Sequence, residues 1–396
     1  MRPKTASRPK ILVFCDYYLP GYKSGGGMRT IVNMVERLGE RYDFFIVTRD
    51  HDGALERQSY TGVKIGEWND VGLAKVYYLP KTDVRFQTLR RLVSTVSPDT
   101  LYFNSFFSAL TIYVLILRKL RLIANLPTVL APCGELSGGA MKIKTFKKQF
   151  FTRPAKTSGI YNRLIWKASS ELEKTEIAAV KGNGGKIFVA PDLSPKMILP
   201  EFNQSKKPLK KRGAAKMIFL SRFARKKNFK WLLEILPQVA GNLEIDVWGP
   251  IEDAEYWSEC KKIIENLPAN IKVEAKGAIP HSEAVRKIID YHFFVLPTLG
   301  ENFGHVFVEA LAAGCPLVVS DSTPWLDLEK KKIGWDLPLG APEKWIETLN
   351  YCIDLDEKDF LELSANARNF AVKWLKDDSV EMKTAEILDY SRGARF

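Results

Sequence analysis

The stretch from residue 293 to residue 325 constrains the fold of this chain more than any other part of it. An apolar run over residues 292–296 stops at Pro297, which predicts a buried strand of a parallel sheet. A loop follows, and small residues then predict a helix over about 304–313. A second apolar run at 317–320 completes a β-loop-α-β unit, so the sequence predicts an α/β fold.

Two carboxylates lie in this unit, Glu301 in the loop and Glu309 on the predicted helix. A loop that leads from a parallel strand into a helix N-terminus is where α/β proteins bind phosphate-bearing ligands. A glutamate just before a helix can also do no more than complement the helix dipole. The geometry alone leaves both interpretations open.

The sequence around these two carboxylates resembles the signature of the family 4 glycosyltransferases. Seven residues separate Glu301 from Glu309, and the surrounding strings read GENFGH, EALAAGCP and SDSTPW. Members of this family are retaining enzymes of the GT-B fold, and these strings are similar to those of a bacterial branch that builds surface polysaccharide. The resemblance implies two doubly wound, Rossmann-like α/β domains that face a cleft.

The resemblance also implies roles for residues of the C-terminal half. Arg222 and Lys227 follow a predicted strand at 217–220 and would hold the diphosphate of a nucleotide sugar. Glu301 would contact sugar hydroxyls, so the predicted catalytic set is Arg222, Lys227 and Glu301. Glu309 would bind the ribose, and the remaining donor-binding positions in this half are Asn302, Phe303, Gly304, His305 and Gly249.

A glycine run in the N-terminal half completes the predicted donor site. Gly25, Gly26 and Gly27 lie between a predicted strand at 10–16 and a predicted helix at 29–38, and glycine lets a backbone approach a ligand closely. The run is not GxGxxG, so it does not predict a dinucleotide site, and a flexible turn is the alternative. In the resembled family this loop lies near the donor phosphates and the acceptor.

The chain departs from the family pattern at two positions. Relatives often carry a histidine near Asn104, and Cys133 stands where the bacterial branch has an arginine. Neither a histidine-based role nor a cationic contact is therefore carried over to these positions. We interpret the thiol of Cys133 as a packing group.

Composition predicts two domains. The chain has 396 residues, of which 46% are hydrophobic, enough for two cores of ordinary size. We expect an N-terminal, acceptor-side domain at 1–193 and a nucleotide-sugar donor domain at 217–375. Residues 194–216 are rich in Pro, Lys, Asn and Gln without an apolar period, which predicts a linker. As in GT-B proteins, residues 376–396 are expected to form a terminal helix that crosses back to the N-terminal domain.

The net charge of +13 lies in the N-terminal half. Residues 1–193 hold 30 Lys and Arg against 16 Asp and Glu, whereas the remainder holds 29 against 30. Within that half, residues 141–167 interleave Lys and Arg with Phe, Tyr and Trp, including Trp166. This pattern suits an anionic membrane surface, although it would also suit nucleic acid or a solvated helix face. We expect an anionic membrane, and no nucleic acid, as the partner.

Neither a metal nor a cofactor is expected. The five cysteines are widely spaced and the four histidines are scattered, so the sequence predicts neither a disulfide framework nor a zinc site and favours a reducing compartment. The apolar run at 11–15 is strand-length rather than a signal-peptide core, and the run at 110–117 is too short to span a bilayer. We expect a cytoplasmic protein that attaches peripherally to the inner face of the cell membrane.

The predicted function is sugar transfer. The resemblance implies that a hexosyl-type sugar moves from a nucleotide-sugar donor to an acceptor hydroxyl with retention, in bacterial polysaccharide or lipopolysaccharide synthesis. The acceptor would be lipid-linked or a saccharide. Two alternatives remain open: a GT-B nucleotide-sugar epimerase, and a basic membrane- or nucleic-acid-binding protein without activity.

Overall fold

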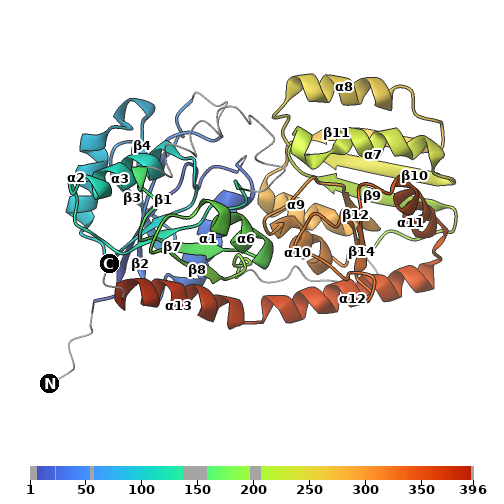
Figure 1. The fold of residues 1–396 in the computed structure, drawn as a ribbon. Coiled ribbons are helices and arrows are strands. Elements are labelled where there is room, and N and C mark those ends of the chain that lie inside the picture. Colours follow the sequence, from blue (N-terminus) through green and yellow to red (C-terminus); the bar gives the residue numbers. More distant parts are fainter. Residues whose placement is uncertain (1–6, 23, 54–57, 137–157, 197–206, 394–396) are drawn as a thin grey trace. The chain divides into compact units, whose positions relative to one another are not determined.

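The structure, a computed structural model, describes residues 7–22, 24–53, 58–136, 158–196 and 207–393. The chain divides into two compact units, which we call unit 1 (Met1–Lys196 and Asp378–Phe396) and unit 2 (Met197–Asp377). Each unit is built on its own largely parallel sheet with helices packed against it (Figure 1). The predicted α/β class with two Rossmann-like bodies is confirmed.

Unit 1 contains an eight-stranded sheet in the order β3-β4-β2-β1-β5-β6-β7-β8. Every neighbouring pair is parallel except β3 and β4, which pair antiparallel at the edge of the sheet. The strands are β1 (Lys10–Phe14), β2 (Asp43–Arg49), β3 (Trp68–Val71), β4 (Ala74–Leu79), β5 (Thr100–Phe103), β6 (Thr128–Leu130), β7 (Ile165–Ala168) and β8 (Lys186–Val189).

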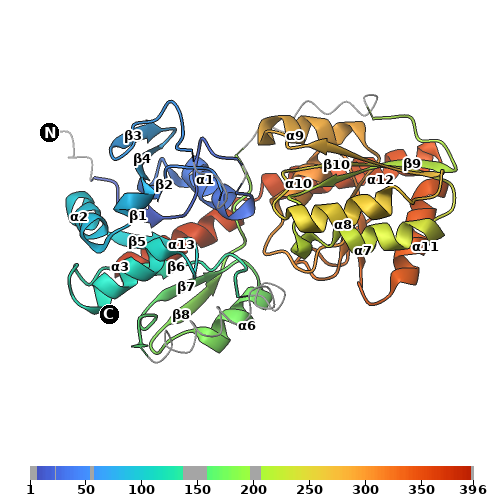
Figure 2. The same ribbon diagram turned by 90° about the horizontal axis from the view of Figure 1, so that it is seen from above.

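The two faces of this sheet carry separate hydrophobic clusters because successive strand residues point to opposite faces. Leu12 and Phe14 of β1 belong to a cluster with α2 (Phe86–Val96) and α3 (Ala109–Lys119), while Ile11 and Val13 belong to a second cluster. The second cluster includes α1 (Gly26–Leu38) and the C-terminal helix α13 (Ser379–Gly393). A further helix of unit 1, α6 (Glu171–Val180), follows β7 (Figure 2).

Unit 2 contains a six-stranded, fully parallel sheet in the order β11-β10-β9-β12-β13-β14. Figure 2 shows α7 and α8 on one face of this sheet and α9 and α10 on the other. The strands are β9 (Ala214–Leu220), β10 (Asn242–Trp248), β11 (Ile271–Gly277), β12 (Phe293–Leu296), β13 (Leu317–Ser320) and β14 (Gly334–Leu337). The helices are α7 (Phe229–Ile235), α8 (Ala254–Ile264), α9 (His281–Lys287), α10 (His305–Ala312), α11 (Pro342–Asp354) and α12 (Glu357–Leu375).

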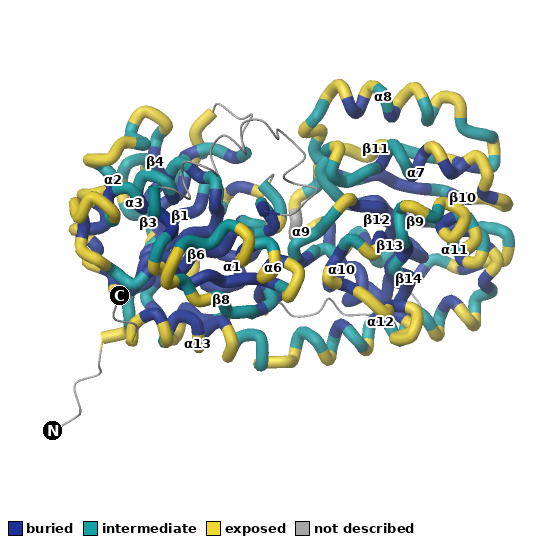
Figure 3. Tube along the Cα trace, in the orientation of Figure 1, coloured by how far each residue is buried: buried dark blue, intermediate teal, exposed yellow. Residues whose placement is uncertain are grey.

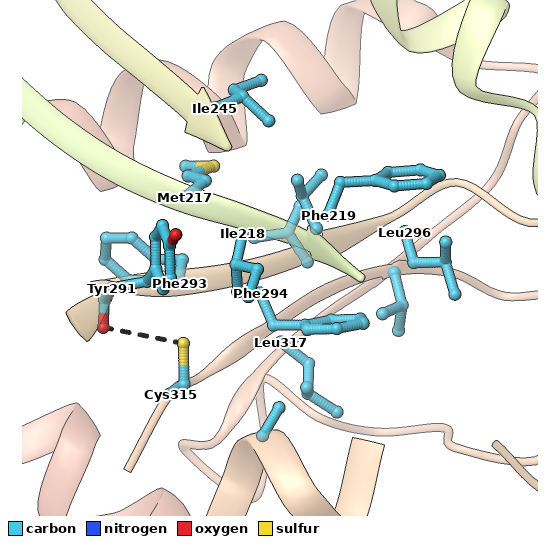
Figure 4. Packing of buried hydrophobic residues seen from close by; sticks show 14 of the residues in the cluster. Met217, Ile218, Phe219, Ile245, Tyr291, Phe293, Phe294, Leu296, Cys315 and Leu317 are labelled. Atoms are coloured by element: carbon cyan, nitrogen blue, oxygen red, sulfur yellow. Dashed lines mark hydrogen bonds between the residues drawn. The ribbon is translucent and has the colours of Figure 1, made fainter. Parts of the chain in front are cut away.

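The central strands of unit 2 are buried on both faces, as expected for a parallel sheet covered by helices (Figure 3). Figure 4 shows how Ile218 of β9, Phe294 of β12 and Leu317 of β13 pack together. The thiol of Cys315 donates to the carbonyl of Tyr291 at 3.7 Å in the same core. The predicted strand, helix and strand of residues 293–325 correspond to β12, α10 and β13, with bounds that differ by one residue or less.

Local structure differs from what the sequence predicted in three places. The edge strand β3 was not predicted, and its Trp68 packs on Phe45 and Tyr77. The helix α8 was not predicted either. The described C-terminal part of the predicted linker, residues 207–216, packs onto unit 2: Lys207 donates to the carbonyl of Tyr291 at 2.9 Å, and β9 begins three residues before the predicted start.

The basic segment predicted to meet a membrane lies only partly within the described residues, because residues 141–157 fall outside them. At its C-terminal end the prediction is wrong, since Trp166 of β7 is fully buried in the core of unit 1. Lys167 is buried as well and forms a 2.7 Å ion pair with Asp192. A strand in the middle of a sheet cannot offer these side chains to a bilayer. Among the described residues, no helix is long and apolar enough to cross a membrane.

Candidate active site

The strand order of unit 2 reverses between β9 and β12. From β9 the chain proceeds outward to β10 and β11, and then returns to place β12 on the other side of β9. In parallel α/β sheets, ligands bind outside the carboxyl ends of the strands at such a switch point. Two loops lie there, residues 221–228 after β9 and residues 297–304 after β12, which we call the β9 loop and the β12 loop.

A close approach of two backbones fixes the start of the β9 loop. The Ser221 N–H donates to the carbonyl of Trp248 at 2.9 Å. Gly249 has a φ of 144°, and a Cβ there would lie 2.0 Å from the carbonyl oxygen of Ser221. Gly249, predicted as a donor-binding residue, thus has a structural role in shaping the loop that carries Arg222.

Carboxylates just before α8 and within it pair with two arginines of the β9 loop. Arg222 lies 2.8 Å from Glu252, whereas Arg225 lies 3.2 Å from Asp253 and 2.9 Å from Glu259. Exposed ion pairs of this kind contribute little to stability. Among the described residues Arg222 has one carboxylate partner and Arg225 has several, so an anion can replace the partner of Arg222 more readily.

Hydrogen bonds of Thr298 and its neighbour connect the β12 loop to the β9 loop. The hydroxyl of Thr298 lies 3.2 Å from the carbonyl oxygen of Lys226, to which the N–H of Leu299 also donates at 2.8 Å. At the end of β13, the hydroxyl of Ser320 donates to the carbonyl of Thr298 at 2.5 Å. Thr298 and Ser320 are fully buried. Their bonds fix the ends of three strands relative to one another.

An ion pair joins the two loops, between the ammonium group of Lys227 and the carboxylate of Glu301. The two side chains are 14% and 15% exposed. Burial by itself would raise the pKa of Glu301, but the positive charges of Lys227, Lys226 and Arg222 outweigh burial and hold that pKa below its ordinary value. Glu301 is therefore anionic at neutral pH, with its charge balanced by Lys227.

The helix α10 starts from a glycine in the left-handed region. Gly304 has a φ of 81°, and a Cβ there would lie 2.5 Å from the ring of Phe307. Within the part of the chain that the structure describes, no side chain caps this N-terminus, and the first turn of α10 contains no acidic residue. The first N–H groups of α10 and the positive end of its dipole therefore favour an anion beside the β12 loop.

Aromatic packing holds the second half of the β12 loop. The indole N–H of Trp325 donates to the carbonyl of Phe303 at 2.6 Å, and the ring of Phe303 lies 4.9 Å from that of His305. The Glu301 N–H donates to the carbonyl of Ser322 at 3.2 Å. Phe303 is buried, so a contact between this predicted donor-binding residue and a ligand would have to come from its backbone.

The second predicted carboxylate, Glu309, lies on α10, four residues after His305. Residues at this spacing share one side of a helix. Both side chains are 7% exposed, so only a small part of each is accessible to a ligand. Asn302 is partly exposed in the β12 loop.

A cavity of about 440 Å³ adjoins the carboxyl ends of β10 and β11, at the same edge of the sheet as the two loops. Trp248 lines it, and its indole N–H donates to the hydroxyl of Tyr291 at 3.0 Å. Tyr291 in turn donates to the buried carboxylate of Asp246 at 2.8 Å. The remaining lining residues are Ala278, Ile279, Pro280, Glu283, Arg286, Lys287 and Asp290. A larger groove of about 710 Å³, between α11 and α12 beside β14, shares no residue with the two loops.

The glycine run predicted to bind the donor lies in unit 1, at the carboxyl end of β1, where the strand order reverses toward β5. Gly25 has a φ of 74° and precedes α1, and the amide of Asn104 donates to the carbonyl of Gly27 at 2.7 Å. The thiol of Cys133 donates to the side-chain oxygen of Asn104 at 3.0 Å. Burial raises the pKa of this thiol well above its ordinary value, so it remains protonated as a donor.

The structure thus brings Arg222, Lys227 and Glu301 together in unit 2, beside the N-terminus of α10. Sequence reasoning missed Thr298 and Ser320, because single hydroxyl residues inside apolar runs carry no spacing signal. Apart from Trp248, which precedes the predicted donor-binding residue Gly249, it also missed the lining of the smaller cavity, whose residues are brought together by the order of the strands.

Comparison with known proteins agrees with this fold. Two structures of low sequence identity match almost the whole chain: HepE from Anabaena, in complex with UDP and glucose (TM-score 0.68, 16% identity, 97% of this chain and 100% of that chain), and sucrose-phosphate synthase from Thermosynechococcus elongatus (0.73, 15%, 98% and 100%). The chain has the GT-B fold.

Three further comparisons concern a family model, another solved structure and the curated protein sequences. Residues 201–370 match the family model described as glycosyl transferases group 1, which covers most of unit 2 and fewer than half of all residues. The GT-B chain is also similar to WaaG, a glycosyltransferase involved in lipopolysaccharide biosynthesis (TM-score 0.63, 11% identity, 95% of this chain and 98% of that chain). No curated protein sequence matches this chain.

Proposed function

We propose that this GT-B protein is a retaining glycosyltransferase that moves a hexosyl group from a nucleotide-sugar donor to an acceptor hydroxyl. The observation that carries the proposal is the meeting of Lys227 and Glu301 at the switch point between β9 and β12. A cation, an anionic carboxylate and an uncapped helix N-terminus lie within two short loops there. The match of residues 201–370 to glycosyl transferases group 1 supports the same conclusion.

The chemistry follows from the charges at this site. As the bond between C1 of the sugar and the phosphate oxygen breaks, negative charge builds on the leaving diphosphate, and Lys227, Arg222 and the N–H groups at the start of α10 would stabilise it. The acceptor oxygen forms the new bond to C1 on the same face, and its proton passes to the leaving phosphate oxygen. No protein nucleophile and no metal ion are needed for this sequence of events.

The diphosphate would compete with Glu301 for the ammonium group of Lys227. When Lys227 turns to phosphate, the carboxylate of Glu301 becomes an acceptor for sugar hydroxyls, while Glu309 would accept from the ribose. The N–H groups of residues 302–305 would meet the sugar or the phosphate, and the cavity beside Trp248 has the size and the aromatic side chain to hold a base. Each of these groups binds or orients the donor.

The acceptor in this proposal is a bacterial polysaccharide or lipopolysaccharide intermediate, lipid-linked or saccharide, met at the inner face of the cell membrane. Support comes from the similarity to WaaG, which is involved in lipopolysaccharide biosynthesis. The epimerase alternative differs in its product, because an epimerase releases free sugar and nucleotide diphosphate without an acceptor. A binding protein without activity would respond to membranes or DNA but not to nucleotides.

The test is a panel of nucleotide diphosphates and nucleotide sugars, measured by thermal shift and then by calorimetry. UDP and UDP-glucose come first, because HepE is known in complex with both. We expect at least one nucleotide sugar to raise the melting temperature, and turnover of that donor to require an acceptor. If no member of the panel shifts the melting temperature while anionic vesicles or DNA do, the proposal fails.

A further inference from the structure

One surface of unit 1 carries exposed cations that form no ion pair with a carboxylate of the described residues. It is formed by α2, α3 and the turn after α3, and we call it the α2–α3 surface. Its exposed cations are Arg85, Arg90, Arg91, Lys119 and Arg121. From residue 84 to residue 134 the only acidic residue is Asp99, which accepts from the backbone N–H of Lys10 at 2.8 Å.

These cations differ from the surface cations of unit 2. Within the described part of the chain, none of the five forms an ion pair, although Arg85 donates to the carbonyl of Thr82 at 2.6 Å. In unit 2, by contrast, carboxylates lie 2.7 Å from Lys230, 2.7 Å from Lys287 and 2.7 Å from Lys330. The positive charge of the α2–α3 surface is therefore not neutralised by described carboxylates and is available to an anionic partner.

The five cations lie on one surface because of how the two helices run. Both connect parallel strands on the same face of the sheet, so they run in the same direction (Figures 1 and 2). Phe86, at the start of α2, stacks on Tyr113 of α3 with ring centroids 4.5 Å apart. At about 1.5 Å per residue, Arg90 and Arg91 then lie level with the last turn of α3. The buried side of α2, with Leu89, Leu92, Val93 and Val96, faces the sheet.

Exposed apolar side chains lie among these cations. Phe86 is 42% exposed, Leu120 is 61% exposed and Leu122 is 43% exposed. The backbone holds the two leucines outward: Arg121 has a φ of 56°, and the N–H of Leu122 returns to the carbonyl of Leu117 at 2.9 Å, which ends α3. Large apolar side chains that the backbone holds exposed to solvent, beside arginines, are typical of surfaces that enter the interfacial region of a bilayer.

We propose that the α2–α3 surface binds the headgroup region of an anionic lipid bilayer. Arginine and lysine would meet the lipid phosphates, while Phe86, Leu120 and Leu122 would enter the acyl boundary. DNA would meet the cations but would leave the exposed leucines in water, so the bilayer is the partner that accounts for both kinds of side chain. This inference does not depend on the proposed transfer activity, because the binding would exist without it.

The experiment is sedimentation of the full-length protein with vesicles of phosphatidylcholine alone and of phosphatidylcholine with phosphatidylglycerol, at about 0.1 M and about 1 M salt. We expect binding to the anionic vesicles at low salt and at least tenfold weaker partitioning of the variant R90Q/R91Q/K119Q/R121Q. The matched control, K261Q/K262Q/K358Q/K373Q, removes the same charge from exposed positions of unit 2 and should partition like the wild type.

A second pair of variants tests the apolar contact. F86S/L120S/L122S should lose the part of the binding that persists at high salt, whereas L209S, at an exposed leucine of unit 2, should not. Circular dichroism and melting temperature check that each variant is folded. If the four-residue variant does not fold, R90Q/R91Q and K119Q/R121Q are measured separately.

Three results would overturn the proposal. The first is equal sedimentation with neutral and anionic vesicles. The second is wild-type partitioning of the α2–α3 variants, above all if the change of Lys142, Lys144, Lys147 and Lys148 to Glu abolishes binding instead. The third is binding of duplex DNA, but not of vesicles, that the α2–α3 variants lose. Donor thermal shifts are measured in parallel, so failure here is separable from failure of the transferase proposal.

Discussion

The ammonium group of Lys227 contacts the carboxylate of Glu301 across 74 residues of sequence. Each side chain comes from a loop at the end of a different strand, and each neutralises the other in a largely buried position. A ligand with a diphosphate group would change this relationship, because it offers Lys227 a stronger anionic partner. The pair is therefore the first place at which to test the function by mutation.

Removing either cation should weaken donor binding. We expect Arg222→Ala or Lys227→Ala to reduce affinity for a nucleotide diphosphate at least tenfold, since each change removes a charge-assisted contact of roughly 1.5–3 kcal/mol. Arg225→Ala is the matched control, because its guanidinium is held by Asp253 and Glu259. Calorimetry that gives the wild-type affinity for both variants would contradict the assignment.

The effect of Lys227→Ala on folding can be separated from its effect on binding. Loss of Lys227 leaves the Glu301 carboxylate partly buried without its main partner, so the pKa of Glu301 should rise and the protein should lose roughly 1–3 kcal/mol of stability. Adding Glu301→Gln should restore much of that stability without restoring affinity. Equal melting temperatures for the single and the double variant would argue against the coupling.

The two carboxylates should have different kinetic signatures. Glu301→Gln should lower kcat with a modest change in nucleotide affinity, because it acts on the sugar, whereas Glu309→Gln should weaken the nucleotide itself. Each is an isosteric change that removes a charge. If both variants keep full transfer activity, the two carboxylates do no more than complement the helix dipole.

Gly249 is expected to be essential for the shape of the β9 loop. Gly249→Ala places a Cβ about 2 Å from the carbonyl of Ser221, so the loop that carries Arg222 must move. We expect loss of donor affinity and a lower melting temperature. Gly340→Ala, at a glycine with no atom within 4 Å of the added carbon, should change neither. A fully active Gly249→Ala protein would show that the close approach is not required.

His292 should make the stability of unit 2 depend on pH. It is buried, its Nδ1 accepts from the N–H of Lys216 at 2.8 Å, and burial, with the charges of Lys210 and Lys207, lowers its pKa to about 4. When the pH lies below the ordinary histidine pKa of about 6.5, His292 binds a proton in the unfolded chain but not in the folded chain. Stability should therefore fall, by up to about 3 kcal/mol, as the pH falls from 6.5 to 4. Denaturant unfolding should give a flatter pH profile for His292→Asn, and an unchanged slope would exclude His292 as the cause.

Much of the fold could be predicted because local sequence and tertiary structure agree. The predicted strands that correspond to β9, β12 and β13 are buried on both faces, so their apolar composition identifies them. The edge strand β3 was not predicted, because its pairing depends on aromatic contacts of Trp68 with Phe45 and Tyr77. Trp166 and Lys167 were assigned to a membrane surface because composition does not reveal that they lie on an inner strand.

Sequence alone determined which residues could serve a phosphate-bearing donor. The strings around Arg222, Lys227, Glu301 and Glu309 resemble a known signature, and their types and spacing are properties of the chain itself. Tertiary structure decided how they are held. The strand order brings the β9 and β12 loops together, and the hydroxyls of Thr298 and Ser320 fix both loops so that Lys227 reaches Glu301. Tertiary structure also determines that the cations of the α2–α3 surface lack carboxylate partners among the described residues. Charge pairing depends on distances in space, which sequence positions do not give.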